Sequence, residues 1–441
     1  MRTDEEIREA VRDLMFNNIK AGLSPYLGKH YCYVMPSPSN YPFQWWWDTC
    51  FSIFILCALG EYTLARQNLR SLFAMQEKDG YVGHMIFWES LLPNNLLTFL
   101  QGPPAWRQIR PHMSSLVQPP LVAQALERMF EISGDRECLQ EMIPKIKKYF
   151  QWLIENRDFD GDGLISIIST FESGIDWKPS FDEVLGFETV KATEKYFWKN
   201  VSVELRNFLR WYNAKRIYKA NVFIVKEVLF NTMFVQDLRA LGRLCREIED
   251  ADSEKYEALA DRAAKRMMQI MYDDETAAFY DVYGHDNKKL KVLTFTIAVP
   301  IMMNDVPKEI AIRILRRHFF NQHEFDLKYP IPSVAKSEPS FCPYESKFLW
   351  RGPTWVVSNW LLYNCLLHKG FTKEADKILS SVKNLIELSG FREYYNPFTG
   401  EGYGAKDFTW SGLIVDMFRL KNEFDAQQSL IVRSDGVLKT A

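Results

Sequence analysis

The sequence has little that would suit a membrane, a disulfide framework or a nucleic-acid surface. Its longest apolar run, residues 51–59, is far shorter than the ~20 residues needed to cross a bilayer, and residues 1–12 lack an apolar signal core. Seven cysteines, an odd number without metal-ligand spacing, indicate reduced thiols. The formal net charge of -2 argues against a nucleic-acid partner. We therefore expect a cytoplasmic protein that binds neither a membrane nor nucleic acid.

Motifs for metal-dependent or nucleotide-dependent chemistry are also missing. The sequence contains no G-x-x-x-x-G-K-[ST], no G-x-S-x-G and no HxxxH pair. Residues 158–163 copy half of a calcium loop, but Ser169 stands where a bidentate Glu is required, so we predict only a turn. Asp273-Asp274 lacks the third carboxylate of a magnesium cluster, because Ala277 takes its place. We expect neither a cofactor nor a metal ion.

Aromatic residues are the unusual part of the composition. They make up 15% of the chain, with 13 Trp, 20 Tyr and 31 Phe, whereas the hydrophobic fraction of 47% is ordinary for a globular protein. A core alone seldom needs so many wide, half-polar rings. We therefore expect some of them to line a ligand site.

Apolar residues recur at helical spacing along most of the chain, and strand-like alternation is scarce. Very short turns at 60–61, 133–135 and 369–370 join neighbouring segments into antiparallel hairpins. No linker separates them, so the expected fold is all-α, a toroid of helix hairpins forming one domain over 1–441. The predicted helices are 4–22, 47–60, 62–77, 118–133, 137–156, 224–249, 253–272, 307–320, 351–368, 371–389 and 407–421.

Three long stretches lack this periodicity, namely 80–116, 171–222 and the shorter 325–347. Loops longer than about 15 residues in a compact domain are usually functional, so we expect these inserts to roof one end of the toroid. The insert 80–116 combines aromatic rings with glycines, which suits a lid over the site, although a static surface loop fits as well.

Asp176 is the first candidate catalytic group. It lies beside Trp177 on a turn that contains Gly174. An apolar neighbour can raise the pKa of a carboxyl group and keep it protonated as a general acid. The alternative is that Asp176 caps the next helix, which is a common position for Asp.

A second acid-bearing segment, 391–404, packs glycines and aromatic rings around Glu393 and Glu401. Such a segment cannot be helical. An acid among rings in a rigid turn suits a base that activates water beside a sugar. A tight interhelical loop without a catalytic role is the alternative.

Residues 45–47 are three consecutive tryptophans, which cannot all point into one core. Flat rings stack on the C–H faces of sugars, while Gln44 and Asp48 can bond hydroxyl groups. The alternative is a helix start capped by Asp48, with the rings as packing. Farther along, Pro353 fits the first turn of another helix, whose N–H groups point into the same loop face.

Together these segments resemble the signature blocks of glycoside hydrolase family 63, in that family's order. The similarity extends over about residues 33–418, and the length matches the short members that act as mannosylglycerate or glucosylglycerate hydrolases. It implies an (α/α)6 barrel and an inverting mechanism, with Asp176 as general acid and Glu393 as general base. The matching blocks are 44–49 with its W-W-D-T core, 118–120, 172–176, 350–355 and 393–400.

In an inverting mechanism a protonated Asp176 gives its proton to the glycosidic oxygen, while an ionised Glu393 draws a proton from the attacking water. The two carboxyl groups are then expected about 6.5–9.5 Å apart. Glu401 is the alternative base. The side chains expected to contact the substrate are Tyr41, Gln44, Trp47, Asp48, Trp88, Gln118, Trp177, Arg216, Trp350, Arg351, Gly352, Trp355, Tyr394 and Trp410.

A glycerate aglycone would bring a carboxylate that needs a cation. Arg206, Arg210, Lys215 and Arg216 of the second insert are candidates, because arginine forks bind both carboxylate oxygens; a solvated helix face is the alternative. The sequence leaves open whether the sugar is glucose or mannose, and whether the chain forms a homo-oligomer. Two rival functions also stay open: an α-glucosidase for a neutral disaccharide or oligosaccharide, and a non-catalytic carbohydrate-binding toroid.

Overall fold

The computed structural model describes residues 2–89, 112–187, 194–345 and 349–438. Its centre is built from helices that are rich in buried side chains, as in α2, where every residue except Ala58 is buried. These inner elements are α2 (Trp46–Leu59), α5 (Val122–Ser133), α9 (Val228–Glu247), the 3-10 helix η4 (Phe295–Met302), α12 (Val356–Lys369), and the 3-10 helix η6 (Thr409–Leu413) with α14 (Ile414–Leu438).

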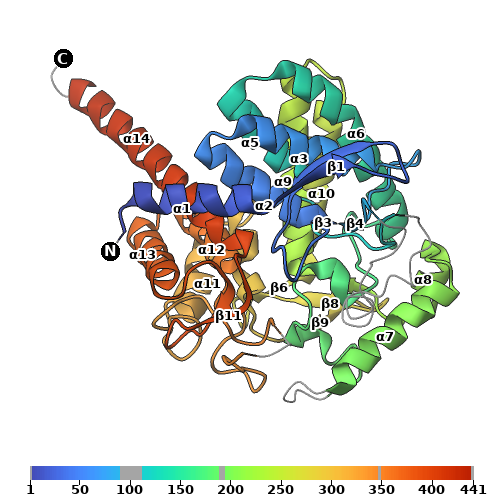
Figure 1. Cartoon of the computed structure of the whole chain (residues 1–441). Coiled ribbons are helices and arrows are strands. Elements are labelled where there is room, and N and C mark those ends of the chain that lie inside the picture. The colour runs from blue at the N-terminus through green and yellow to red at the C-terminus, as the bar shows by residue number, and fades with distance from the viewer. Residues whose placement is uncertain (1, 90–111, 188–193, 346–348, 439–441) are drawn as a thin grey trace.

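The inner elements contact one another in chain order and close into a ring. α2 contacts α5, α5 contacts α9, α9 contacts η4 and η4 contacts α12; α12 then contacts η6 and α14, both of which contact α2. The structure is therefore an (α/α)6 barrel, as the sequence led us to expect (Figure 1). The outer helices are α3 (Tyr62–Ala74), α6 (Arg136–Arg157), α10 (Ser253–Ile270), α11 (Lys308–Ile314), α13 (Thr372–Ser389) and α1 (Asp4–Asn17).

Left-handed residues end several inner helices where the sequence predicted hairpin turns. Gly60 after α2 has φ +79° and Gly370 after α12 has φ +82°, a region that glycine enters without steric cost. Each turn reverses the chain, so the next helix returns along the outside of the ring. The contacts α2–α3 and α12–α13 are the resulting hairpins.

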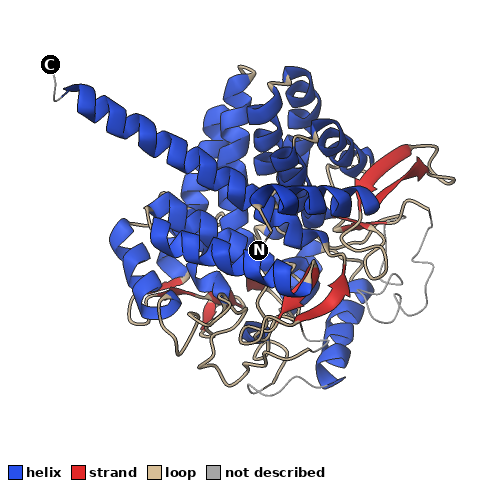
Figure 2. Ribbon diagram, turned by 60° about the vertical axis from the view of Figure 1, so that its left-hand side comes forward, coloured by secondary structure: helices blue, strands red, loops and turns tan. Residues whose placement is uncertain are grey.

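Short antiparallel strands and loops gather mainly at one end of the helical body, while α14 projects away from it (Figures 1 and 2). All seven cysteines are free thiols. None of the described helices combines the length and the apolar character that a membrane crossing requires. The strand pairs are β1 (Ile19–Leu23) with β2 (His30–Val34), β3 (Gln44–Trp45) with β4 (Met85–Ile86), β5 (Val225–Lys226) with β8 (Asp281–Tyr283) and β9 (Lys288–Leu290), β6 (Tyr272–Asp273) with β7 (Ala278–Phe279), and β10 (Arg392–Tyr395) with β11 (Gly402–Lys406).

The first predicted helix, 4–22, is too long. α1 ends at Asn17, and the next residues form strand β1, in which Ile19 pairs with Val34. The partner strand supplies backbone hydrogen bonds that local helical periodicity does not report. Similarly, the predicted helix 307–320 is helical only to Ile314 and continues as a π-helical turn, η5 (Leu315–Phe319).

The insert 171–222 is not irregular throughout. It contains α7 (Glu194–Leu209) and α8 (Ala214–Ala220), together with the 3-10 turns η2 (Thr170–Ser173) and η3 (Pro179–Phe181). The buried face of α7 carries Asn200, Glu204 and Asn207, so an apolar pattern could not reveal the helix. Most of the other insert, 80–116, falls on residues 90–111, which lie outside the described part, and its lid function stays a prediction.

Asp237 of α9 caps a neighbouring helix from the side. Its carboxylate accepts the backbone N–H groups of Ala123 (3.1 Å) and Gln124 (2.8 Å) at the start of α5, where the N-cap residue Leu121 makes no side-chain cap. Asp237 is fully buried, so no water replaces these bonds. The carboxylate therefore joins two inner helices of the ring.

Replacing Asp237 with Ala should leave two buried N–H groups without acceptors and lower the free energy of unfolding by about 2–4 kcal/mol. Urea denaturation measures this change. Asp261→Ala removes an aspartate that is 71% exposed and pairs with Arg239, and it should cost less than about 0.5 kcal/mol. Equal losses in the two variants would contradict the capping role of Asp237.

Candidate active site

The residues predicted for the site lie where the chain enters the inner helices. Because each hairpin returns the chain to the same end, these entry points gather on one side of the ring. Asp48 is in the first turn of α2, Gln118 precedes α5, Trp355 precedes α12 and Trp410 lies in η6 before α14. Three signature blocks that are far apart in the sequence, and the segment that carries Trp410, thus lie at the starts of inner helices.

Glu393 lies in β10 and is 5% exposed. Tyr41 donates its hydroxyl to Glu393 Oε1 at 2.7 Å, and the backbone N–H of Ala405 donates to Oε2 at 2.8 Å. Burial raises the pKa of Glu393, and these two donors act against that rise by stabilising the carboxylate. Gly404, with φ +65°, permits this packing, since a Cβ there would lie 2.5 Å from Glu393 Oε2.

Asp176 follows η2 and is half-buried. Loss of water around it raises its pKa to about 7, and the negative charge of Glu204 on α7 acts in the same direction. Gly174, with φ +69°, lets this turn pack against Trp47, because a Cβ there would lie 2.5 Å from the indole ring. Asp176 does not cap a regular helix; the next residue, Trp177, has φ +65°.

Asp48 is a third buried carboxyl group at the same place. Burial raises its pKa to about 7, and the charges of Asp176 and Glu393 contribute to the rise. Trp410 donates its Nε1–H to Asp48 Oδ1 at 2.8 Å, and this hydrogen bond opposes the rise in the pKa of Asp48. The charges of both other acids act on Asp48, so these two groups lie within electrostatic range of Asp48. Glu401, the alternative base, is instead exposed and accepts a bond from Tyr403.

Aromatic rings pack into a continuous wall beside these acids. Trp350 stacks on Trp355 with centroids 3.9 Å apart, and Trp355 stacks on Tyr394 at 5.1 Å. Trp410 contacts Trp355 at 5.8 Å and Trp47 edge-on at 5.2 Å. These five rings were all predicted for the site, and the structure brings them together.

Of the three consecutive tryptophans, Trp45 is the one that keeps accessible surface. Trp46 stacks on Tyr149 and Trp47 packs against Trp410, both inside the protein. Trp45 lies edge-on to Tyr41, the donor to Glu393, with ring centroids 6.1 Å apart. The sequence named Trp47 as a substrate contact but left open which of the three rings faces the sugar, because no local pattern in three identical residues distinguishes the exposed ring.

Several side chains that were predicted to contact the substrate form hydrogen bonds with other protein groups. Gln44 is fully buried. Its side-chain amide donates to the backbone carbonyl of Asn68 and accepts the indole N–H of Trp88, which is also buried. The side-chain oxygen of Gln118 accepts the backbone N–H of Trp47 at 3.2 Å. In the described structure these three predicted side chains therefore bond to groups within the protein.

Arg351 and Gly352 likewise have structural contacts. Arg351 is 2% exposed and forms a two-pronged ion pair with Asp182. Gly352, with φ +141°, lies against the backbone of Cys342, where a Cβ would be 2.9 Å away. Contact of either residue with the substrate stays untested.

Arg216 is the predicted cation that was also named as a substrate contact. Arg216 is exposed on α8, and its backbone N–H is bonded to the N-cap Asn213. No described bond joins Arg216 to the acids, so its role as a carboxylate partner stays a prediction.

Trp177, which was also predicted to contact the substrate, is half-buried and its ring meets that of Phe171 edge-on.

The calcium-like stretch forms a turn after α6, as predicted. Lys226 is 3% exposed at its side chain and reaches Asp160 at 2.5 Å and Asp162 at 2.9 Å. The ammonium group occupies the position where two loop carboxylates converge. The positive charge of Lys226 therefore compensates the two carboxylates.

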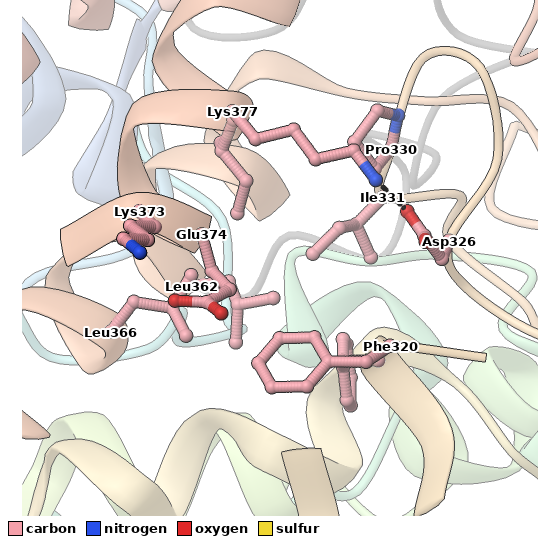
Figure 3. A pocket seen from close by; sticks show the side chains of 11 residues that line it. Phe320, Asp326, Pro330, Ile331, Leu362, Leu366, Lys373, Glu374 and Lys377 are labelled. Carbon is pink, nitrogen blue, oxygen red and sulfur yellow. Dashed lines mark hydrogen bonds and ion pairs between the residues drawn. The ribbon is translucent and has the colours of Figure 1, made fainter. Parts of the chain in front are cut away.

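A cavity of about 360 Å³ lies elsewhere in the barrel, between α12, α13, η5 and the loop 326–331. Figure 3 shows Phe320, Ile331 and Leu362 around its interior, with Lys377 reaching Asp326 at its edge. None of its lining residues was predicted for the site, and neither Asp176 nor Glu393 is among them.

Residues 41–411 match the family described as the mannosylglycerate hydrolase MGH1-like glycoside hydrolase domain. The chain belongs to this family. It is thus an O-glycoside hydrolase, and the matched range contains both predicted catalytic acids.

Individual members of the family cover most of the chain. A mannosylglycerate hydrolase of Thermus thermophilus is 29% identical over 413 residues, which are 87% of this chain and 95% of that protein. A glucosylglycerate hydrolase of Mycolicibacterium hassiacum is 25% identical over 425 residues, 86% and 92% of the two chains. A crystal structure of a glycoside hydrolase family 63 mannosylglycerate hydrolase from T. thermophilus superimposes with a TM-score of 0.80 at 25% identity, covering 94% of this chain and 100% of that one.

Replacing Gly174 with Ala should disturb the turn that carries Asp176. The substitution combines a left-handed backbone, which costs about 1–2 kcal/mol, with a collision against Trp47. We expect kcat/KM to fall by about ten-fold or more, because the carboxyl group is displaced. Steady-state kinetics and thermal unfolding measure the two effects.

Gly60→Ala is the matched control, because Gly60 has φ +79° and no atom within 4 Å of the added Cβ. It should lower stability by the backbone cost alone and leave kcat/KM unchanged. If Gly174→Ala behaves like Gly60→Ala in both measurements, the close packing on Trp47 does not position the acid.

Proposed function

We propose that the protein is an inverting glycoside hydrolase that cleaves an α-mannosyl- or α-glucosylglycerate, with Asp176 as general acid and Glu393 as general base. The observation that carries the proposal is that two hydrogen-bond donors stabilise the ionised form of Glu393, whereas loss of water dominates at Asp176. Asp176 has a pKa raised to about 7, whereas Glu393 receives two hydrogen bonds that favour its ionised form. Acid and base roles require two carboxyl groups whose environments differ in this way.

Asp176 would protonate the glycosidic oxygen. A carboxyl group with a pKa near 7 is largely protonated in slightly acidic solution and still gives up its proton readily. As the bond between the anomeric carbon and that oxygen breaks, the proton passes to the leaving glycerate hydroxyl. Partial exposure of Asp176 leaves its oxygen accessible to the substrate.

Glu393 would take a proton from the water that attacks the opposite face of the anomeric carbon. Tyr41 and the N–H of Ala405 leave lone pairs of the carboxylate available while fixing its orientation. An inverting reaction requires room for that water, so the two carboxyl groups should be about 6.5–9.5 Å apart in the substrate complex.

Asp48 and the aromatic wall would bind the sugar. Buried carboxylates bond hydroxyl groups, and flat rings such as Trp45 pack against C–H faces, as in other concave sites with a few polar anchors. The glycerate carboxylate would need a cation, and Arg206, Arg210, Lys215 or Arg216 remains the predicted partner.

The choice of glycerate as the aglycone follows the names of the relatives, two of which are a mannosylglycerate and a glucosylglycerate hydrolase. Glucose and mannose differ only at the 2-hydroxyl, so the donor sugar is left to experiment. The seven free thiols support the expected cytoplasmic location. The non-catalytic alternative would have no need for two acids of which one is bonded so that its ionised form is favoured.

Purified protein should be incubated with mannosylglycerate, glucosylglycerate, trehalose and a kojibiose-type disaccharide. We expect hydrolysis of a glycosylglycerate, with the β-anomer of the sugar as the first product by NMR. Asp176→Ala and Glu393→Ala should lower kcat by about 10²–10⁴-fold while remaining folded. Glu401→Ala, which removes the exposed acid of the same segment, should retain activity. Unimpaired turnover in either acid variant, or retention of configuration, would overturn the proposal.

The pH dependence of kcat/KM should be bell-shaped. Activity is lost on the basic side as Asp176, with a pKa of about 7, gives up its proton, and on the acid side as Glu393 becomes protonated. Tyr41→Phe removes a donor that stabilises ionised Glu393, so the pKa of Glu393 rises and the acid limb moves to higher pH by up to about one unit.

The basic limb should stay in place in Tyr41→Phe. Tyr403→Phe serves as the control, because that hydroxyl is bonded to Glu401 and not to Glu393, and it should move neither limb. An unchanged acid limb in Tyr41→Phe would mean that Glu393 is not the base whose ionisation limits the reaction.

A further inference from the structure

The stretch 172–182, which we call the acid segment because it carries Asp176, is held at three positions by four buried ion pairs. They involve positions 172, 178 and 182, on both sides of Asp176, and the side chains are at most 3% exposed. Removing such charges from water costs free energy, which only good geometry offsets. The pairs are Glu172 with Arg157, Lys178 with Glu227 and Asp281, and Asp182 with Arg351.

Lys178 makes the ion pair nearest to the acid, two residues away. Its ammonium group contacts Glu227 and lies 2.7 Å from Asp281 Oδ2. Ser180 donates to the same Asp281 oxygen at 2.6 Å, so one carboxylate holds two residues of the acid segment. Burial alone would lower the pKa of Lys178, but its two partners raise it above the ordinary value, which keeps the lysine charged.

The two partner carboxylates belong to the rigid part of the barrel. Asp281 begins strand β8 and accepts the backbone N–H of Val228 at 2.9 Å. Glu227 is the N-cap of α9 and accepts the N–H of Phe230 at 2.5 Å. The ammonium group thus links the acid segment to the start of an inner helix and to a strand, neither of which is near it in sequence.

The backbone between Asp176 and Lys178 needs such a link. Trp177 has φ +65°, a conformation that costs a residue with a Cβ about 1–2 kcal/mol and persists only where the surroundings hold it. This residue lies directly between Asp176 and Lys178 in the chain. Loss of the anchor immediately after it would let the turn relax to an ordinary conformation and displace the carboxyl group.

Lys178 acts on Asp176 through geometry rather than through its charge. Among the described residues, the charge that acts on Asp176 is that of Glu204 from α7, and Lys178 makes no contribution to its pKa shift. Lys178 is 2% exposed and already faces two carboxylates, so it has no surface for a substrate. It is therefore not a catalytic residue.

We infer that Lys178 is a positioning residue, which holds the Asp176 carboxyl group in its water-poor position by tying the acid segment to Glu227 and Asp281. The inference rests on the proposed role of Asp176 as general acid. It assigns a function to a buried lysine that neither binds substrate nor transfers a proton.

Lys178→Met tests the inference by removing the tie at nearly constant volume. A displaced Asp176 gains water, so its pKa falls from about 7 towards the ordinary value of an aspartate. The basic limb of kcat/KM should therefore move to lower pH by about one unit or more, with kcat lower by about 10–100-fold and KM changed less than about three-fold. A residue that only stabilises the fold would lower the amount of active enzyme without moving this limb.

A second variant covers the case in which Lys178→Met does not fold because it leaves two carboxylates unpaired. Lys178→Met combined with Glu227→Gln and Asp281→Asn removes all three charges, a change that buried ion pairs often tolerate. It should show the same shift of the basic limb. Folding of each variant is checked by circular dichroism and thermal unfolding.

Lys226→Met is the matched control. Lys226 is also a buried lysine between two carboxylates, Asp160 and Asp162, but it holds a turn that does not carry the acid. It should lower stability and leave both limbs in place.

The outcomes separate the inference from the proposed function. If Asp176→Asn retains activity, the proposed function fails. If Asp176→Asn is inactive but folded Lys178 variants keep the basic limb of the wild type, only the positioning role is overturned. A shift of the basic limb in the Lys178 variants, with no shift in Lys226→Met, supports the positioning role of Lys178.

Discussion

Removal of three carboxyl groups from water is the constraint on which this site depends. Asp176, Asp48 and Glu393 share one aromatic enclosure, where burial raises the pKa of each. Three like charges so close together are unfavourable, and the distribution of hydrogen-bond donors decides which group ionises most readily. Glu393 receives two donors and Asp48 one, from Trp410. In the proposed mechanism, the division of labour between acid and base therefore originates in the residues that donate hydrogen bonds to these carboxyl groups.

Features with a local cause were predictable from the sequence. The hairpin turns follow from left-handed glycines such as Gly60, and the ring of paired helices follows from the turns. Asp176 and Glu393 could be singled out because an acid set among glycines and aromatic rings is unusual in any turn or loop. These properties depend on neighbours in the chain, which a sequence displays directly.

Features with a distant cause were not predictable. Helix α7 was not predicted because its inner face carries Glu204 and two asparagines. These side chains bond to residues 168–170 rather than packing against apolar side chains. Arg351 belongs to a signature block and resembles a ligand for substrate, yet its partner is Asp182, 169 residues away in the chain. The accessible ring among residues 45–47 is likewise decided by the tertiary packing of Tyr149 and Trp410.

The closure of the ring has a consequence for the order of folding. α14 completes the inner ring by contacting α2, and α1 packs against both, so helices from opposite ends of the sequence are joined last during synthesis. Contacts of such long sequence separation form late, because the loop between them must first be ordered. Trp410 and Glu393 lie in this last part of the chain. If both Asp176 and Glu393 are needed, as we propose, a chain that is synthesised only as far as α13 lacks the general base.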